Sequence, residues 1–150
     1  MRGPGAGRQD ERVTYRILCG YDQSAGAEKA FDFALRLARR FDGELHVLAV
    51  FEPADASRGV KAETLQESAL GQFSAGLERL RARAAEDGLE LATSVAVGYP
   101  AQEILKRAEA LHADHVVVGQ RGKNSFERSA LGSVSLRIVS HGAGTVTVVR

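Results

Sequence analysis

The chain has 150 residues, a formal net charge of +1 at pH 7 and one cysteine. This length predicts a single domain, large enough to bury a core without disulfides or metals. The near-zero charge argues against a nucleic-acid-binding protein, because such proteins carry a marked excess of basic residues. A single cysteine excludes an intrachain disulfide and is typical of a reducing compartment, so we expect a cytoplasmic protein.

The first twelve residues, Met1 to Arg12, are rich in glycine and arginine and contain no apolar stretch. A secretory signal peptide needs such a stretch, and no run in the chain approaches the ~18 apolar residues that span a bilayer. We therefore predict a flexible arm over residues 1–13, a domain over residues 14–150, and no membrane insertion.

Three elements are predicted in the first third of the domain. The apolar run around Cys19 predicts a buried strand with an unreactive thiol. Asp22 to Ser24 form a turn, in which Ser24 is the expected N-cap of the next helix. That helix ends at Asp42-Gly43. The predicted elements are a strand over 15–21, a helix over 27–41 with apolar positions at helical spacing, and a β-branched strand over 44–51.

The rest of the chain continues the same alternation of helices and strands. The predicted elements are a helix over 62–86, a strand over 89–97, a helix from Pro100, a strand over 115–118, a helix over 133–141 and a strand over 145–149. This order predicts an α/β fold with an open five-stranded parallel sheet and helices on both faces. Ligands in such sheets bind beyond the carboxyl ends of the strands. The turns at Asp22 and Gly119 therefore become candidates for one site.

Three glycines near the C-terminus have a spacing that indicates phosphate binding. Gly119 ends an apolar run, Gly122 follows three residues later, and Gly132 directly precedes Ser133. Glycine lets backbone N–H groups approach a ligand without a Cβ in the way, and consecutive N–H groups form an anion nest. A helix beginning at Gly132-Ser133, with Ser133 as its expected cap, adds a positive dipole end. The loop also contains three cations: Arg121, Lys123 and Arg128.

Other phosphate-binding and metal-binding motifs do not fit this sequence. A P-loop requires Ser or Thr after Gly-Lys, but Gly122-Lys123 is followed by Asn124. A dinucleotide fingerprint requires G-x-G-x-x-G after the first strand, where Gly20 and Gly26 do not supply it. The four histidines, His46, His112, His115 and His141, show no metal-ligand spacing.

With these residues in place, the chain resembles the universal stress protein family from about Tyr15 to Arg150. The nucleotide-binding branch of that family carries G-x2-G-x9-G-[ST], which the glycine motif and Ser133 match without gaps. Asp22-Gln-Ser24 is similar to the family's first turn, which usually has glycine where Gln23 stands. The segments 48–53 and 98–100 also match, whereas His141 to Thr145 departs from the family's usual Cys or Ala and Pro.

The resemblance implies a Rossmann-like universal stress protein domain that binds ATP with Mg²⁺ and forms a homodimer through the last strand. It places Asp22 near the ribose, the phosphates or their metal, and Val50 at the adenine. Gly119 and Gly122 would line the ribose and phosphate path, and the start of the last helix would hold the β- and γ-phosphates. The predicted cofactor-binding residues are Gly20, Tyr21, Asp22, Val50, Val118, Gly119, Arg121, Gly122, Gly132, Ser133, Val134 and Ser135.

Three functions remain open at this point. The first is an ATP-binding, dimeric cytoplasmic regulator in the stress response, with an unidentified protein partner and no more than weak ATPase activity. The second is an enzyme of related fold, such as an ATP pyrophosphatase or a nucleotidyl transferase. The third is a nucleotide-free interaction module, in which Asp22 only forms the turn and the glycine loop binds nothing.

Overall fold

The computed structural model describes residues 13–53, 60–121 and 131–150. Most of the predicted arm, and the predicted phosphate-loop residues Gly122, Lys123 and Arg128, lie outside this part of the chain. The elements in chain order are β1 (Arg16–Gly20), α1 (Ala25–Phe41), β2 (Glu44–Phe51), α2 (Val60–Glu86), β3 (Leu91–Val97), α3 (Pro100–Leu111), β4 (His115–Gly119), α4 (Ser133–His141) and β5 (Thr145–Val149).

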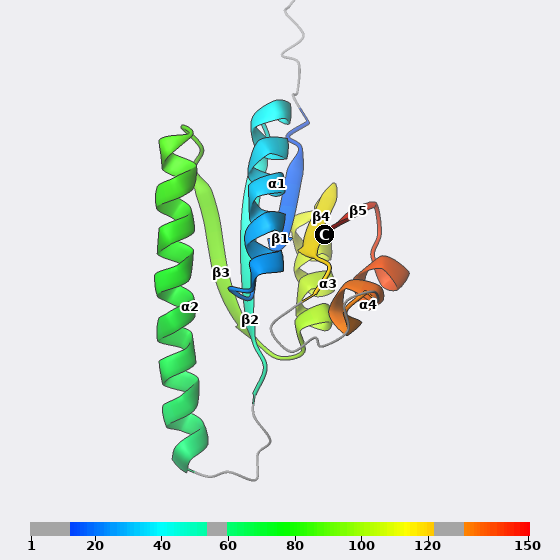
Figure 1. The fold of residues 1–150 in the computed structure, drawn as a ribbon. Helices are drawn as coiled ribbons and strands as arrows, with labels where there is room; N and C mark the ends of the chain where they lie inside the picture. Colours follow the sequence, from blue (N-terminus) through cyan, green and yellow to red (C-terminus); the bar gives the residue numbers. More distant parts are fainter. Residues whose placement is uncertain (1–12, 54–59, 122–130) are drawn as a thin grey trace, which may run out of the picture.

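The five strands form one sheet in the order β3-β2-β1-β4-β5, and every neighbouring pair is parallel. The predicted α/β fold is therefore confirmed. Helices cover both faces of the sheet (Figure 1). One apolar core joins the sheet to α1 and α2, and the other joins it to α3 and α4. Among the described helices, none is both long and apolar enough to cross a membrane.

The ends of the helices follow from local chemistry. Ser24 caps α1 as predicted, since its Oγ accepts a hydrogen bond from the Ala27 amide at 3.1 Å. Asp42 adopts the left-handed conformation that ends α1. The strand predicted from residue 89 begins instead at Leu91. The Leu89 amide donates to the Ala84 carbonyl at 2.9 Å and so closes the end of α2.

Helix α2 packs against the sheet mainly through its C-terminal half. Leu77, Leu80 and Ala84 of the predicted apolar face are buried, and Phe73 is partly buried against the same core. Figure 1 shows the N-terminal half of α2 extending beyond the end of α1. In this half, residues 67–72 are exposed or half-buried.

Cys19 is fully buried in the core, as predicted. Burial, together with the negative charge of Glu28, raises the pKa of its thiol to about 12. The thiolate is the nucleophilic form of cysteine, so this thiol is inert at neutral pH.

His115 connects the middle of the edge strand β5 to the body of the sheet. Its Nδ1 lies 3.0 Å from the Tyr15 hydroxyl and its Nε2 lies 2.6 Å from Thr147 Oγ1. Burial lowers the pKa of His115, so the neutral ring is favoured. A neutral imidazole can donate from one nitrogen and accept at the other, which fits two hydroxyl neighbours.

Candidate functional site

The turns after β1 and β4 touch at the carboxyl edge of the sheet, as the sequence predicted. The strand order reverses between these two strands, and ligands of parallel α/β sheets bind at such a point. Gly26, in the first turn of α1, packs backbone to backbone against Gly119. A Cβ added to Gly119 would lie 2.7 Å from the Gly26 carbonyl carbon, and one added to Gly26 would lie 2.8 Å from the Arg121 carbonyl oxygen.

The N-terminus of α4 faces the same turn. The Gly132 amide donates to the Gln120 carbonyl at 2.8 Å, and the Leu136 amide is the first to donate back to the helix, to the Gly132 carbonyl. Gly132 is the N-cap, so the prediction of Ser133 as the cap is wrong by one residue. No described side chain caps the helix, so the N–H groups of residues 133–135 remain available to an anion.

Arg121 supplies the most informative side chain of the site. Its Nε and Nη2 atoms are buried and have no hydrogen-bond partner among the described residues. Buried polar atoms are nearly always paired, and a guanidinium has only donors to offer. The missing partner must therefore be an acceptor, and a negatively charged one satisfies the charge as well as the hydrogen bonds.

The Ser135 hydroxyl makes hydrogen bonds within the protein rather than to a ligand. Its side chain is buried, and Oγ donates to the Gly119 carbonyl at 2.6 Å, with the Gln120 carbonyl at 3.2 Å. The hydroxyl thus ties the start of α4 to the end of β4. Val134 packs its side chain against the core on the α3 and α4 face. At Val134 and Ser135, therefore, the backbone N–H groups rather than the side chains are left for contact with a ligand.

The first turn, residues 22–24, is shaped by Asp22 and Gln23. Asp22 Oδ1 accepts from the Ser24 amide at 3.0 Å, which is the hydrogen bond of an Asx-turn. Gln23 has a φ of 67°, in the left-handed region that favours glycine. This conformation explains why a glycine suits the position. No group of three potential metal-ligating side chains occurs in the described part of the chain.

Four other predicted residues lie in or next to the strands below these turns: Gly20, Tyr21, Val50 and Val118. A Cβ on Gly20 would lie 2.8 Å from Ile104 Cδ1, so side chains already fill that space. Val118 and Val50 are both buried. Val50 pairs with Ala96 of β3, two residues beyond the point at which β2 stops pairing with β1. Tyr21 turns its side chain into the opposite core, so only its backbone faces the edge.

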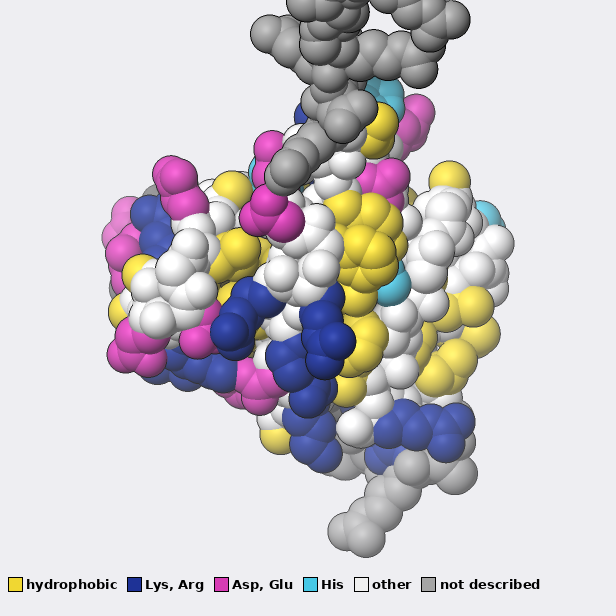
Figure 2. Space-filling model, turned by 90° about the horizontal axis from the view of Figure 1, so that it is seen from above, with side chains coloured by type: hydrophobic (Ala, Val, Ile, Leu, Met, Phe, Trp, Pro, Cys, Tyr) yellow, Lys and Arg dark blue, Asp and Glu magenta, His cyan; other side chains and the backbone are white. Residues whose placement is uncertain are grey.

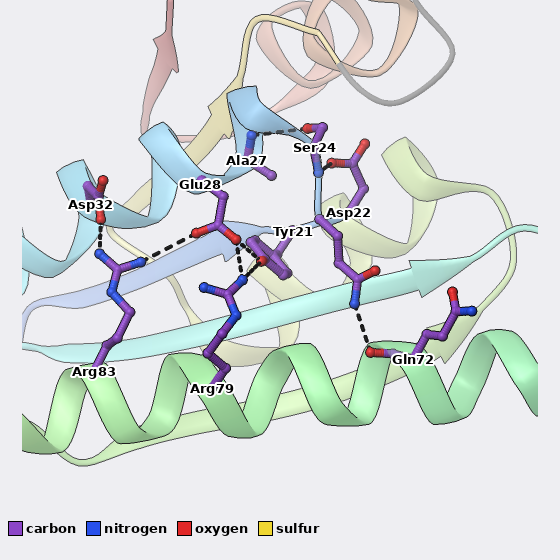
Figure 3. A network of polar contacts seen from close by, with 10 residues as sticks. Tyr21, Asp22, Ser24, Ala27, Glu28, Asp32, Gln72, Arg79 and Arg83 are labelled. Carbon is purple, nitrogen blue, oxygen red and sulfur yellow. Dashed lines mark hydrogen bonds and ion pairs between the residues drawn. The ribbon is translucent and has the colours of Figure 1, made fainter.

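Tyr21 belongs to a polar network that sequence reasoning missed (Figure 3). Its hydroxyl donates to Glu28 and accepts from Arg79 Nη2 at 2.8 Å, and Arg79 also pairs with Glu28. Arg83 contacts Glu28 at 3.3 Å and pairs with Asp32. The network joins the start of α1 to α2. Five polar residues spread over about sixty positions give no local spacing signal, which is why the sequence did not reveal the network.

The network shifts the pKa values of its members. Burial raises the pKa of Tyr21 to about 12, and the Glu28 carboxylate adds to this effect. Burial alone would raise the pKa of Glu28, but hydrogen bonds from Arg79 and Tyr21 and the charge of Arg83 lower it. Glu28 is therefore ionised and Tyr21 protonated at neutral pH.

A hollow beside α1 is lined by none of the predicted site residues, although Val149 in its lining pairs with Gly119 at the end of β4. It is a shallow pocket of about 550 Å³ beside α1, lined by Lys29, Asp32, Leu35, Arg36, Arg83, Asp87, Val149 and Arg150. Figure 2 shows Lys and Arg side chains gathered on one part of the surface, with acidic side chains next to them. None of the predicted site residues lines this pocket.

Comparison with known proteins agrees with the predicted fold and family. The model of the universal stress protein family matches residues 14–150. Universal stress protein MJ0531 of Methanocaldococcus jannaschii is 32% identical over 150 residues, covering 95% of this chain and 86% of that protein.

Solved structures show the same architecture. Universal stress protein UspA from Lactobacillus plantarum has a TM-score of 0.84 at 26% identity, covering 91% of this chain and 97% of that one. A universal stress protein in complex with cAMP has a TM-score of 0.71 at 22% identity, with 91% and 97% covered. Because the family model spans almost the whole chain and the match to a curated relative extends over 95% of it, the chain belongs to the universal stress protein family.

Proposed function

We propose that this protein binds an adenine nucleotide, ATP with Mg²⁺, where the turns after β1 and β4 meet the N-terminus of α4. The observation that carries the proposal is the buried Arg121 guanidinium, two of whose nitrogens have no partner among the described residues. The Arg121 backbone lies beside the N-terminus of α4, with its Cα 3.5 Å from a Cβ added to Gly132, and no described side chain caps the first amides of that helix. Both features favour an anion. A structural neighbour in complex with cAMP supports the nucleotide class.

The residues present could contact such a ligand in order along its length, from the phosphates through the ribose to the adenine. The amides of residues 133–135, together with Arg121, would hold phosphate oxygens. Gly119 and Gly122 would lie along the ribose and phosphate path, and the backbone of Val50 would face adenine. Asp22 would approach the ribose or a phosphate-bound Mg²⁺. Magnesium would supply charge neutralisation for the phosphates, and the single carboxylate of Asp22 suits the indirect binding that Mg²⁺ prefers with nucleotides.

Replacing Arg121 by glutamine is expected to weaken binding of Mg-ATP by at least about ten-fold, because a charge-assisted hydrogen bond to phosphate is lost. Calorimetric titration of nucleotide-stripped protein checks this result, with ADP, AMP and cAMP titrated in parallel to rank the ligands. Arg137→Gln is the matched control, since Arg137 is an exposed arginine on α4. Equal affinity in both variants would contradict the assignment of Arg121. No binding by the unmodified protein would favour a nucleotide-free interaction module.

We further propose that the protein is a regulator in the stress response of the cytoplasm rather than an enzyme, and that it acts as a homodimer. A turnover assay with excess Mg-ATP tests the first part, and rapid hydrolysis over many turnovers would contradict it. The support for a dimer is the edge position of β5, whose outer side is open in the sheet. Leu136 and Val139 of α4, the helix that packs beside β5, are exposed by 53% and 47%.

Replacing Val139 by glutamate is expected to raise the dimer dissociation constant by at least about ten-fold, since it places a charge in an apolar interface. Light scattering after size-exclusion chromatography over a concentration series measures the change. Val97→Glu is a matched control because Val97, at the opposite edge of the sheet, is also exposed by 47%. A greater loss of dimer from the Val97 variant would place the interface at β3 instead.

A further inference from the structure

Gln23 reaches from the first turn to the middle of α2. Its Nε2 donates to the Gln72 carbonyl at 2.7 Å, and the dashed line at Gln72 in Figure 3 marks this hydrogen bond. In an α-helix the carbonyl of residue 72 also accepts from the amide of residue 76. Gln23 thus adds a second donor to a carbonyl inside α2, next to the half of the helix that extends beyond α1.

Gly76 provides the space into which this side chain fits. A Cβ added to Gly76 would lie 2.5 Å from Gln23 Nε2 and 3.4 Å from its Cδ. Any larger residue at position 76 would therefore displace the amide group and break its hydrogen bond. At Gly71, in the same helix, an added Cβ would have no atom of another described part of the chain within 4 Å, apart from the backbone of its own helix. The two glycines thus differ in one respect: only Gly76 touches Gln23.

Both partners of this contact are locally unfavourable choices. A non-glycine residue is disfavoured at the φ of 67° that Gln23 adopts. Glycine is disfavoured inside a helix, where alanine would be preferred. Two unfavourable residues that fit one another are better explained by their contact than by either position alone.

We propose that Gln23 and Gly76 form a specific contact that fixes the first turn to α2, and that Gln23 is thereby a positioning residue of the candidate site. Asp22 and Ser24 flank Gln23 directly, so holding its side chain also restricts the turn that carries them. The neighbouring ties from Arg79 to Tyr21 and Glu28 hold the next segment of chain to the same helix. The Gln23 contact attaches the turn itself to α2 as well.

A double-mutant cycle in the absence of ligand tests the contact. Gly71→Ala is expected to lower the unfolding equilibrium constant by about five-fold, as glycine removal from an open helix position does. Gly76→Ala is expected to give a clearly smaller gain, because Gln23 must leave Gln72. In the Gln23→Gly background, Gly76→Ala should recover the full gain, whereas the effect of Gly71→Ala should not change. Urea unfolding of the full chain measures all six proteins.

Each outcome of the cycle decides the proposal. Coupling between positions 23 and 76 without coupling between 23 and 71 supports it. Additive effects for both pairs, 23 with 76 and 23 with 71, overturn the proposal. Equal coupling in the two pairs also overturns it, since such coupling would be a general property of α2. Gln23→Glu supplies a variant of the same size that cannot donate to the Gln72 carbonyl. It should speed amide hydrogen exchange over residues 67–76 and leave residues 80–86 unchanged, and uniform exchange in both segments counts against the contact.

The positioning role rests on the proposed nucleotide function and has its own measurement. Gln23→Gly is expected to weaken Mg-ATP binding about two- to five-fold, because a freed glycine turn loses more conformational entropy on ordering. Gly71→Ala should leave the affinity unchanged. An unchanged affinity in Gln23→Gly overturns the positioning role. If the unmodified protein binds no nucleotide, that role falls together with the proposed function, while the cycle still decides the contact.

Discussion

Replacing Gly119 by alanine is expected to lower the free energy of unfolding by about 3 kcal/mol, at the upper end of the range for overpacking. The added Cβ would lie 2.7 Å from the Gly26 carbonyl carbon, 2.8 Å from its oxygen and 3.1 Å from the Ala27 amide nitrogen. All three atoms belong to the backbone of the first turn of α1. Backbone atoms inside a helix cannot swing aside as a side-chain end can, so β4 and α1 must move apart.

Urea unfolding without nucleotide measures this effect. Gly71→Ala is the control, since the same substitution in open space should stabilise the protein by up to about 1 kcal/mol. The comparison also separates two roles of Gly119. A stability loss without ligand assigns the glycine to packing against Gly26, in addition to any contact with phosphate. A stability equal to that of the unmodified protein would contradict the packing role and leave the ligand role alone.

Replacing Glu28 by glutamine is expected to cost about 2 kcal/mol of stability at pH 7, the range found when a hydrogen-bonded charge is removed from its partners. Glu28 accepts from Tyr21, Arg79 and Arg83, and its side chain is only 30% exposed. The glutamine amide has the same shape as the carboxylate, but its NH2 group would face a guanidinium, and both groups are donors. Thermal or urea unfolding at pH 7 gives the value.

The same variant carries a pH signature with a defined sign. The pKa of Glu28 is lowered in the folded protein from its usual 4.5, so the unfolded state binds the proton more readily. The stability from Glu28 is therefore fully present above about pH 4.5, and it is lost as the pH falls through the lowered value. The gap between the unmodified protein and Glu28→Gln should be constant from pH 7 to 5 and should shrink below pH 4.5.

Glu109→Gln is the control for this pH series, because Glu109 is an exposed carboxylate on α3. It should follow the unmodified protein at every pH. A gap for Glu28→Gln that widens as the pH falls would reverse the assigned sign and would show that Glu28 is held in its protonated form.

Local signals explain why the sequence predicted the elements of the fold so closely. The helical spacing of Ala30, Phe31, Ala34 and Ala38 describes the buried face of α1, and Ser24 marks its start. Runs of β-branched residues bounded by turns marked the strands. Errors were confined to ends, as at Leu89, where a hydrogen bond to Ala84 keeps the residue in the cap of α2.

The candidate site was predicted less completely, because spacing along the chain does not tell which way a side chain points. The sequence predicted that Asp22, Gly119 and Arg121 lie at one edge of the sheet. It did not reveal that the Ser135 hydroxyl is used by the Gly119 carbonyl, or that Tyr21 turns away toward Arg79. The roles predicted for Gly122, Lys123 and Arg128 fall outside the described residues.

The sequence by itself determined the parallel α/β architecture and the family, and it supplied the motif on which the proposed ligand class rests, since periodicity, turn residues and a glycine motif are local properties of the chain. Only the tertiary structure decided how distant segments approach one another. The backbone contact of Gly26 with Gly119 and the fit of Gln23 against Gly76 join residues far apart in sequence. Such contacts depend on distances of a few tenths of an ångström between packed elements, which no pattern of residue types encodes.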